Sequence, residues 1–185
     1  VPADYKPTLS SAINFYLEGT SRTTIENVIE KAISQGASLI FAEGLQKQDF
    51  IADEQAAIVW IDDLQSCLSQ IASLYYGQPS QQLKTIGVTG TNGKTSCSYL
   101  VAKTLQKLHF ECYLLGTLGV GQSSKLQDCG NTTADAITMQ RILAEAVGAG
   151  AQFVAMEVSS HGLDQYRAAA VNFRTAIFTN LTHDH

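Results

Sequence analysis

The chain has 185 residues, of which 45% are hydrophobic and 16% charged, and its formal net charge at pH 7 is −5. This composition is typical of a folded globular protein and excludes a disordered chain. The acidic balance argues against a nucleic-acid-binding surface, which is normally basic. No apolar run approaches the roughly 20 residues that a membrane-spanning helix needs. Membrane insertion and nucleic-acid binding are therefore not expected.

The four cysteines are widely spaced and form no C-x-x-C pair, which argues against a zinc ribbon or a thioredoxin-like motif. They are Cys67, Cys97, Cys112 and Cys129. We interpret them as reduced thiols of a cytoplasmic protein.

The first part of the chain predicts a small α/β unit from the spacing of its apolar residues. Helices are expected at 25–35 and 64–75, and strands at 38–42 and 57–61. Gly, Gln, Pro and Ser then fill residues 77–82, which we interpret as a linker. The expected domains are therefore 1–82 and 83–185.

Strands and helices alternate in the second part. Strands are expected at 83–88, 112–115, 153–158 and 175–178, helices at 94–108 and 135–147, and an exposed loop at 116–131. Such alternation is typical of βαβ units on a parallel sheet. Ligands of these sheets bind at the carboxyl ends of the strands, where several polar clusters of this chain are found.

The strongest local motif is Gly90-Thr91-Asn92-Gly93-Lys94-Thr95, which follows one of these strands and leads into a helix. Glycines let backbone amides surround phosphate oxygens, and the helix N-terminus favours negative charge. Lys94 would reach the β- and γ-phosphates, and the Thr95 hydroxyl would bind Mg²⁺. The strict phosphate-loop pattern has glycine at position 88, where this chain has valine. We predict an α/β fold in which a small N-terminal α/β domain precedes part of a P-loop-type parallel-sheet ATPase domain.

Three polar clusters follow in the sequence. Glu157 ends an apolar strand, where an acid in a phosphate-loop protein commonly holds Mg²⁺; the alternative is an exposed acid just past the strand. By spacing alone, residues 131–133 simply cap the next helix, and His161 is a structural residue. The run 178–185 is either a solvated tail or part of a site.

Together these segments resemble the Mur ligase family. The resemblance is carried by Thr-Gly-Thr-Asn-Gly-Lys-Thr at 89–95, Asn-Thr-Thr at 131–133, Met-Glu-Val-Ser-Ser-His-Gly-Leu at 156–163 with Gln165 and Arg167, and Phe-Thr-Asn-Leu-Thr-His-Asp-His at 178–185. It is strong over 83–185 and weak over 1–76. The family's Asp-Ser-Arg-like motif for the uridine end is matched only by Leu9-Ser10-Ser11, and His183 stands where the family usually has arginine.

The resemblance assigns roles to individual residues. It implies that ATP is bound by Gly90, Thr91, Asn92, Gly93, Lys94, Thr95 and Ser96, and Mg²⁺ by Thr95, Glu157 and His185. It implies catalytic roles for Lys94, Glu157 and His185. It implies that UDP-MurNAc-L-Ala-D-Glu is contacted by Asn131, Thr132, Thr133, Ser159, Gln165 and Arg167, with Ser10 and Ser11 as candidates for its uridine end.

The implied activity is that of an ATP-dependent amide ligase of peptidoglycan precursor synthesis in the cytoplasm. It would add meso-diaminopimelate, or alternatively L-lysine, to UDP-MurNAc-L-Ala-D-Glu through an acyl phosphate. The family's sequence continues past His185 to a carbamylated lysine and a C-terminal domain, so we expect little ligase activity from these 185 residues alone. The alternatives are another Mur-type ligase, such as folylpolyglutamate synthetase, and a non-catalytic nucleotide-binding module.

Overall fold

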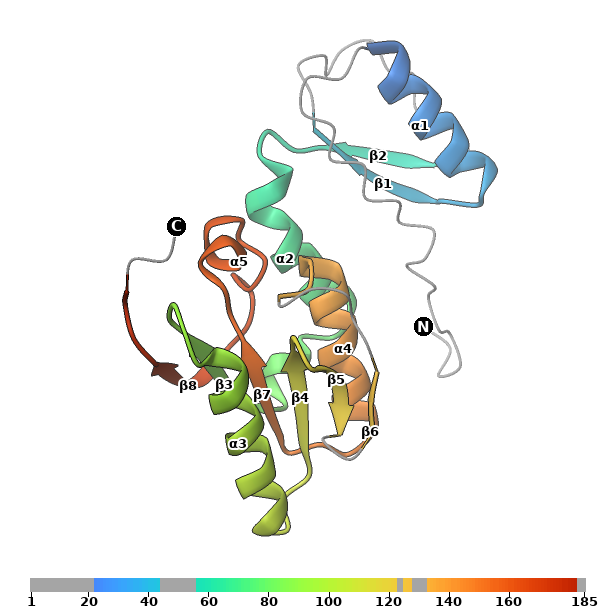
Figure 1. Ribbon diagram of the computed structural model, residues 1–185. Helices are drawn as coiled ribbons and strands as arrows, with labels where there is room; N and C mark the ends of the chain where they lie inside the picture. Colours follow the sequence, from blue (N-terminus) through green and yellow to red (C-terminus); the bar gives the residue numbers. More distant parts are fainter. Residues whose placement is uncertain (1–21, 44–55, 123–124, 128–132, 183–185) are drawn as a thin grey trace. The chain divides into compact units, whose positions relative to one another are not determined.

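The computed structural model describes residues 22–43, 56–122, 125–127 and 133–182, and within them all side chains except those of 22–26 (Figure 1). The chain divides into two compact units, Val1–Leu64 and Gln65–His185. Several residues singled out in the sequence lie outside the described ranges, namely Ser10, Ser11, Cys129, Asn131, Thr132, His183 and His185. Within the described ranges, every helix is too short or too polar to cross a membrane.

The first unit contains the expected helix and both expected strands. Its elements are α1 (Arg22–Ser34), β1 (Leu39–Ala42) and β2 (Ala57–Trp60). The two strands pair in parallel, with Leu39 opposite Ala57. Helix α1 buries Ile29 and Ala32, and it ends before Gly36, whose φ of +88° is readily adopted only by glycine.

The second unit is a mixed sheet with helices on its faces. Its elements are α2 (Leu64–Tyr75, whose first residue lies in the first unit), the 3₁₀ turn η2 (Pro79–Gln81), β3 (Lys84–Thr89), α3 (Lys94–Lys107), β4 (Cys112–Gly116), β5 (Gly119–Gln122), β6 (Lys125–Gln127), α4 (Ala136–Gly148), β7 (Phe153–Glu157), α5 (Ser160–Asp164) and β8 (Phe173–Phe178). The strand order is β6-β5-β4-β7-β3-β8. Strands β4, β7, β3 and β8 run parallel, whereas β5 and β6 are antiparallel additions at one edge. This confirms the predicted α/β fold.

The core explains why β7 reads as a continuous apolar run. Val154 and Met156 pack with the α4 residues Met139 and Leu143 on one side of the sheet. Ala155 packs on the other side with Ala102 of α3. Figure 1 shows the helices α3 and α4 on opposite sides of the sheet. A strand covered on both faces buries alternate side chains in opposite directions, so it shows no polar alternation.

The boundary between the units differs from the expected one. The sequence placed it within 77–82, whereas the compact units divide after Leu64. The reason lies in two buried serines of α2 and η2, which hydrogen-bond within the second unit. Ser69 Oγ donates to the carbonyl of Arg167 at 3.2 Å and accepts from the amide of Ala170 at 3.1 Å. Ser80 Oγ accepts from the Asn172 amide at 3.1 Å.

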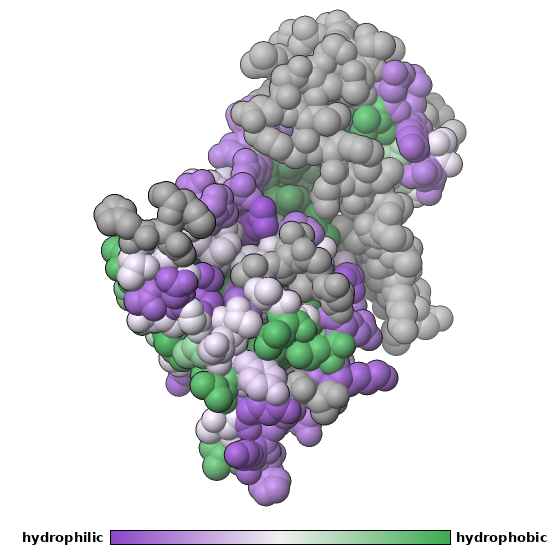
Figure 2. Space-filling model, in the orientation of Figure 1, coloured by the Kyte–Doolittle hydropathy of each residue, from purple (hydrophilic) through white to green (hydrophobic). Residues whose placement is uncertain are grey.

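The expected loop at 116–131 is also corrected in part, because β5 and β6 occupy much of it. The glycines of β5, which suggested a loop in the sequence, instead allow the neighbouring strand β6 to approach closely. A Cβ atom on Gly119 would lie 2.5 Å from the carbonyl oxygen of Gln127, and one on Gly121 would lie 2.8 Å from that of Lys125. Figure 2 shows hydrophobic residues gathered over the β4–β5 region, where Leu118 is exposed.

Candidate functional site

The predicted phosphate loop connects the end of β3 to the start of α3. Gly90 and Gly93 have φ angles of +127° and +84°, which side-chain-bearing residues rarely adopt. A Cβ atom on Gly90 would also collide with the Thr179 hydroxyl. The local fold therefore depends on glycine at both positions, as the motif predicts.

The segment after β8 holds this loop in place. The amides of Thr91 and Asn92 donate to Asn180, to its backbone oxygen and to its Oδ1, both at 3.0 Å. Thr179 Oγ1 donates to the Asn92 carbonyl at 2.6 Å, and Thr91 Oγ1 accepts from the Thr182 amide at 3.0 Å. Residues 179–182 are thus a support for the phosphate loop rather than a solvated tail.

Lys94 and Thr95 occupy the first turn of α3. The Lys94 ammonium donates to the carbonyls of Gly90 and Thr91 at 2.7 and 2.8 Å, so it lies against the loop that precedes it. The Thr95 hydroxyl donates to Glu157 Oε2 at 2.8 Å. Ser96 is exposed. The structure therefore brings Lys94 and Thr95 to the loop, as the sequence predicts.

Glu157 is the last residue of β7 and pairs in register with Val88 of β3. Only 1% of its surface is exposed. Besides the Thr95 bond, its Oε1 accepts from the Thr117 amide at 2.8 Å and its Oε2 from the Thr117 hydroxyl at 3.2 Å. Among the described residues these hydrogen-bond donors are all neutral. The alternative of an exposed acid past the strand is therefore wrong.

The buried carboxylate fits a magnesium site. Mg²⁺ is typically bound by one or two carboxylates together with phosphates of a nucleotide and water, rather than by an all-protein cage. No group of three or more His, Cys, Asp or Glu side chains gathers anywhere in the described residues. Glu157 with Thr95, beside a phosphate loop, matches the donor set that a nucleotide-bound magnesium ion requires.

A second cluster forms where α5 and the loop after it meet Thr133. Thr133 is buried, and its hydroxyl accepts from the Ser159 amide at 3.0 Å and pairs with Ser159 Oγ at 3.1 Å. Ser159 Oγ also caps α5 by accepting from the amide of Gly162 at 3.1 Å. The cap of α4 is instead Asp135, whose side chain accepts from two amides of that helix. The expectation that Thr133 serves only as a helix cap is therefore wrong.

Arg167 joins this cluster. Its Nη1 donates to the Thr133 carbonyl at 2.9 Å, while its Nε and Nη2 both donate to Gln165 Oε1, the former at 2.9 Å. Tyr166 before it has a φ of +55°, an uncommon conformation for a residue with a side chain. Arg167 is half-buried, and its hydrogen-bond acceptors in the described part of the chain are neutral. Within the described residues, Arg167 is therefore a positive charge that neutral acceptors hold in place and no carboxylate neutralises.

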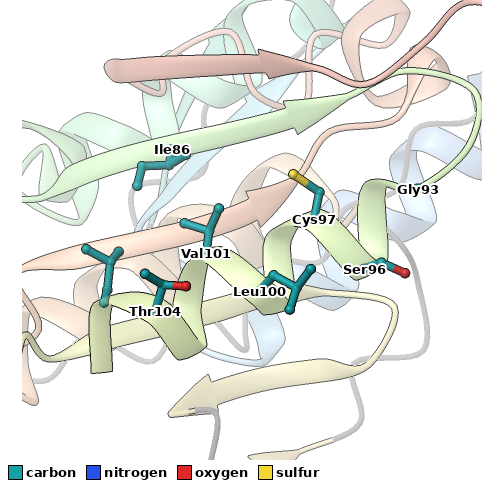
Figure 3. A pocket seen from close by; sticks show the side chains of 8 residues that line it. Ile86, Gly93, Ser96, Cys97, Leu100, Val101 and Thr104 are labelled. Atoms are coloured by element: carbon teal, nitrogen blue, oxygen red, sulfur yellow. The ribbon is translucent and has the colours of Figure 1, made fainter. Parts of the chain in front are cut away.

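An apolar hollow of about 550 Å³ adjoins the phosphate loop. It runs along α3, from Gly93 and Ser96 past Cys97 and Val101. Figure 3 shows Cys97 and Val101 pointing from α3 toward the strand that carries Ile86. The sequence analysis did not predict this hollow, whose lining comes from Ile86 of β3 and from residues 93–105 at the start of α3 and along it.

Sequence reasoning missed Thr117 and Asn180. Thr117 is the first residue after β4 and Asn180 the second after β8, so both lie at the carboxyl ends of strands, as Glu157 does. Thr117 was overlooked because it lies in the stretch expected to be an exposed loop. Asn180 was noted only as part of the run 178–185.

The chain is similar to known proteins of one enzyme family. Residues 88–185 match the Mur ligase middle domain. The UDP-N-acetylmuramoyl-L-alanyl-D-glutamate–2,6-diaminopimelate ligases of Ectopseudomonas mendocina and Haemophilus ducreyi are 47% and 45% identical over 157 and 168 residues. Each comparison covers 85% of this chain, and 32% and 34% of the respective relative.

A solved structure of a ligase with the same name superposes with a TM-score of 0.74 at 30% identity, covering 88% of this chain and 32% of its own. The chain thus spans about a third of the length of the relatives it matches. The matched family domain covers more than half of the present sequence and contains both the phosphate loop and Glu157. The chain belongs to the Mur ligase family.

Proposed function

We propose that this chain is part of an ATP-dependent ligase of peptidoglycan precursor synthesis that adds an amino acid to UDP-MurNAc-L-Ala-D-Glu. The observation that carries the proposal is the 2.8 Å hydrogen bond between Thr95 of the phosphate loop and the buried Glu157. It joins a nucleotide-binding element to a carboxylate that lacks a cationic partner among the described residues. Meso-diaminopimelate is the favoured amino acid because the similar enzymes are named for it, and L-lysine is the alternative.

The proposed reaction has two steps, formation of an acyl phosphate and formation of an amide. A substrate carboxylate oxygen attacks the γ-phosphorus of ATP, and ADP leaves to give an acyl phosphate. The amine of the incoming amino acid then attacks the acyl carbon, phosphate leaves, and the amine loses a proton to form an amide. Bound Mg²⁺ would offset the negative charge of the nucleotide phosphates.

The chain's own residues would mainly position the nucleotide and the UDP-substrate and neutralise their negative charges. The N-terminal amides of α3 favour a phosphate, and Lys94 would exchange its two loop carbonyls for the β- and γ-phosphates. Arg167 presents a rigid charged fork suited to a phosphate or carboxylate of the UDP-substrate. Thr133, Ser159 and Gln165 would line the same subsite, together with Asn131 and Thr132. His185 would contribute to metal binding and catalysis.

Residues 1–82 would bind the UDP end, with Ser10 and Ser11 as candidate contacts. We also propose a cytoplasmic location, because the reaction consumes ATP and both of its nucleotide substrates are cytoplasmic metabolites. The described cysteines Cys67, Cys97 and Cys112 are free thiols, which is consistent with a reducing compartment.

The test is calorimetric titration of the 185-residue chain with Mg²⁺ plus a non-hydrolysable ATP analogue, and separately with UDP-MurNAc-L-Ala-D-Glu. We expect both to bind and the chain alone to show little turnover. Nucleotide binding without UDP-substrate binding would favour a folylpolyglutamate-synthetase-like ligase or a non-catalytic nucleotide module. For a longer polypeptide that contains this chain, ATP-dependent product formation with diaminopimelate against lysine would decide the amino acid.

A further inference from the structure

Thr117 touches the buried carboxylate through both its backbone and its side chain. It is the first residue after β4, and β4 lies beside β7 with Leu115 opposite Met156. This parallel pairing brings the carboxyl ends of the two strands together, so Thr117 reaches Glu157 across them. Its amide is 2.8 Å from Oε1 and its hydroxyl 3.2 Å from Oε2.

Gly116 makes room for this contact. It is buried, and a Cβ atom built on it would collide with the Glu157 carboxylate. Any side chain at position 116 would therefore push the carboxylate away from Thr117. The end of β4 therefore fits the carboxylate in two ways. Gly116 leaves the space that the carboxylate occupies, and Thr117 supplies two hydrogen-bond donors to it.

Orientation matters at this position because magnesium demands a near-ideal octahedral arrangement of its ligands. Groups that hydrogen-bond a metal-binding carboxylate from behind fix its rotation, and their loss weakens metal binding. The Thr95 hydroxyl bonds to Oε2 from the phosphate-loop side, whereas Thr117 bonds to both oxygens from the β4 side.

We propose that Thr117 is a positioning residue that holds the Glu157 carboxylate in the orientation in which it binds the divalent cation of a nucleotide complex. The proposal rests on the proposed function, since it requires such a cation at Glu157. Thr117 would affect the cation only by orienting Glu157. Because Thr117 is exposed, its side chain adds little to the packed core. The hydroxyl is the part that substitution can remove, because the backbone amide stays in place.

The experiment compares Thr117→Val, which removes the hydroxyl but keeps the shape, with Thr117→Ser, which keeps the hydroxyl. Binding of Mn²⁺ in the presence of a non-hydrolysable ATP analogue is followed by electron paramagnetic resonance on the 185-residue chain. We expect Thr117→Val to weaken Mn²⁺ binding about tenfold, as for one hydrogen bond to a charged group, and Thr117→Ser to restore it. Gly116→Ala should weaken binding more. Thr175→Val, at an exposed threonine of β8, is the matched control.

Unfolding temperatures without metal separate positioning from simple structural support. Mn²⁺ affinity of Thr117→Val equal to that of the wild type would overturn the inference. So would losses that Thr117→Ser fails to restore, or that follow an equal loss of stability in metal-free protein. Wild-type protein that binds no Mn²⁺–nucleotide complex would overturn the proposed function as well. Wild-type binding with an unaffected Thr117→Val would overturn only the role of Thr117.

Discussion

Two charged side chains near the end of β7 are held in opposite ways. Glu157 is fully buried and accepts hydrogen bonds from neutral donors of Thr95 and Thr117. Arg167 is half-buried and donates to neutral oxygens of Thr133 and Gln165. In neither case does another described side chain neutralise the charge.

The opposite charges of Glu157 and Arg167 indicate which kind of ligand each surrounding subsite is suited to bind. Neutral hydrogen bonds fix the position of a charge without cancelling it, so each group keeps its attraction for an opposite charge. The anionic subsite lies next to the phosphate loop and suits a cation. The cationic subsite lies near Ser159 and Thr133 and suits an anion. Substitutions that separate position from charge therefore test the comparison.

The largest effect is expected for Glu157→Gln. The amide keeps the size of the side chain but removes the charge, so Mg²⁺-dependent nucleotide affinity should fall by about a hundredfold or more, at the upper end of losses at metal sites. Metal-free stability should change little, because the amide can still hydrogen-bond. Titration calorimetry with and without Mg²⁺ measures the effect. Unchanged Mg²⁺ dependence would place the cation elsewhere.

Arg167→Lys is expected to have the next largest effect. Lysine keeps the charge but loses the planar fork that contacts Thr133 and Gln165 together. Affinity for UDP-MurNAc-L-Ala-D-Glu should fall about tenfold, which corresponds to about one hydrogen bond to a charged group. Binding of the Mg²⁺–nucleotide complex should stay the same. A parallel loss of both ligands would mean that the two subsites are not independent.

These two subsites also show how far the sequence can predict a site. Glu157 and Lys94 were predicted because strand–loop–helix order and the carboxyl-end rule depend only on neighbouring residues. Arg167, Gln165 and Ser159 came from the resemblance to a family. The structure brings Ser159 and Arg167 to Thr133, and Gln165 to Arg167. Their binding of a UDP-substrate stays a prediction.

The parts that sequence could not predict depend on residues distant in the chain. The strands β5 and β6 were missed because glycine normally disfavours strands, whereas here Gly119 and Gly121 let strands approach closely. The division into compact units after Leu64 could not be predicted from the sequence either, because Ser69 bonds to residues about a hundred positions away. Periodicity carries no information about such pairings.

Ser69→Ala should disturb the cationic subsite through its backbone. Ser69 Oγ is fully buried, and its removal leaves the Arg167 carbonyl and the Ala170 amide without this partner. We expect a loss of about 1–3 kcal/mol in the free energy of unfolding and weaker UDP-substrate binding. Ser34→Ala, at an exposed serine of α1, should change stability by less than about 0.5 kcal/mol. Urea denaturation of both variants provides the test, and equal small effects would count against a role for Ser69.

A last test sharpens the comparison with a buried thiol, whose neutral form the fold favours. Cys112 is fully buried, and this burial raises the pKa of its thiol to about 11 from an ordinary value of 9.0. Where Glu157 has three hydrogen bonds to its charged form, the Cys112 thiol donates to the Tyr113 carbonyl at 3.5 Å, which favours its neutral form.

At pH 8 iodoacetamide should therefore modify the half-exposed Cys97 far faster than Cys112 in native protein. The raised pKa alone lowers the Cys112 thiolate fraction about a hundredfold relative to a thiol at the ordinary value, and burial also shields its sulfur. Mass spectrometry of the labelled peptides measures both rates, and labelling in denaturant should make them similar. As the pH rises toward 11 the Cys112 thiolate fraction increases, so its labelling should accelerate. Equal native rates would mean that the sheet around Cys112 opens readily, and that burial there is too transient to keep the thiol neutral and protected.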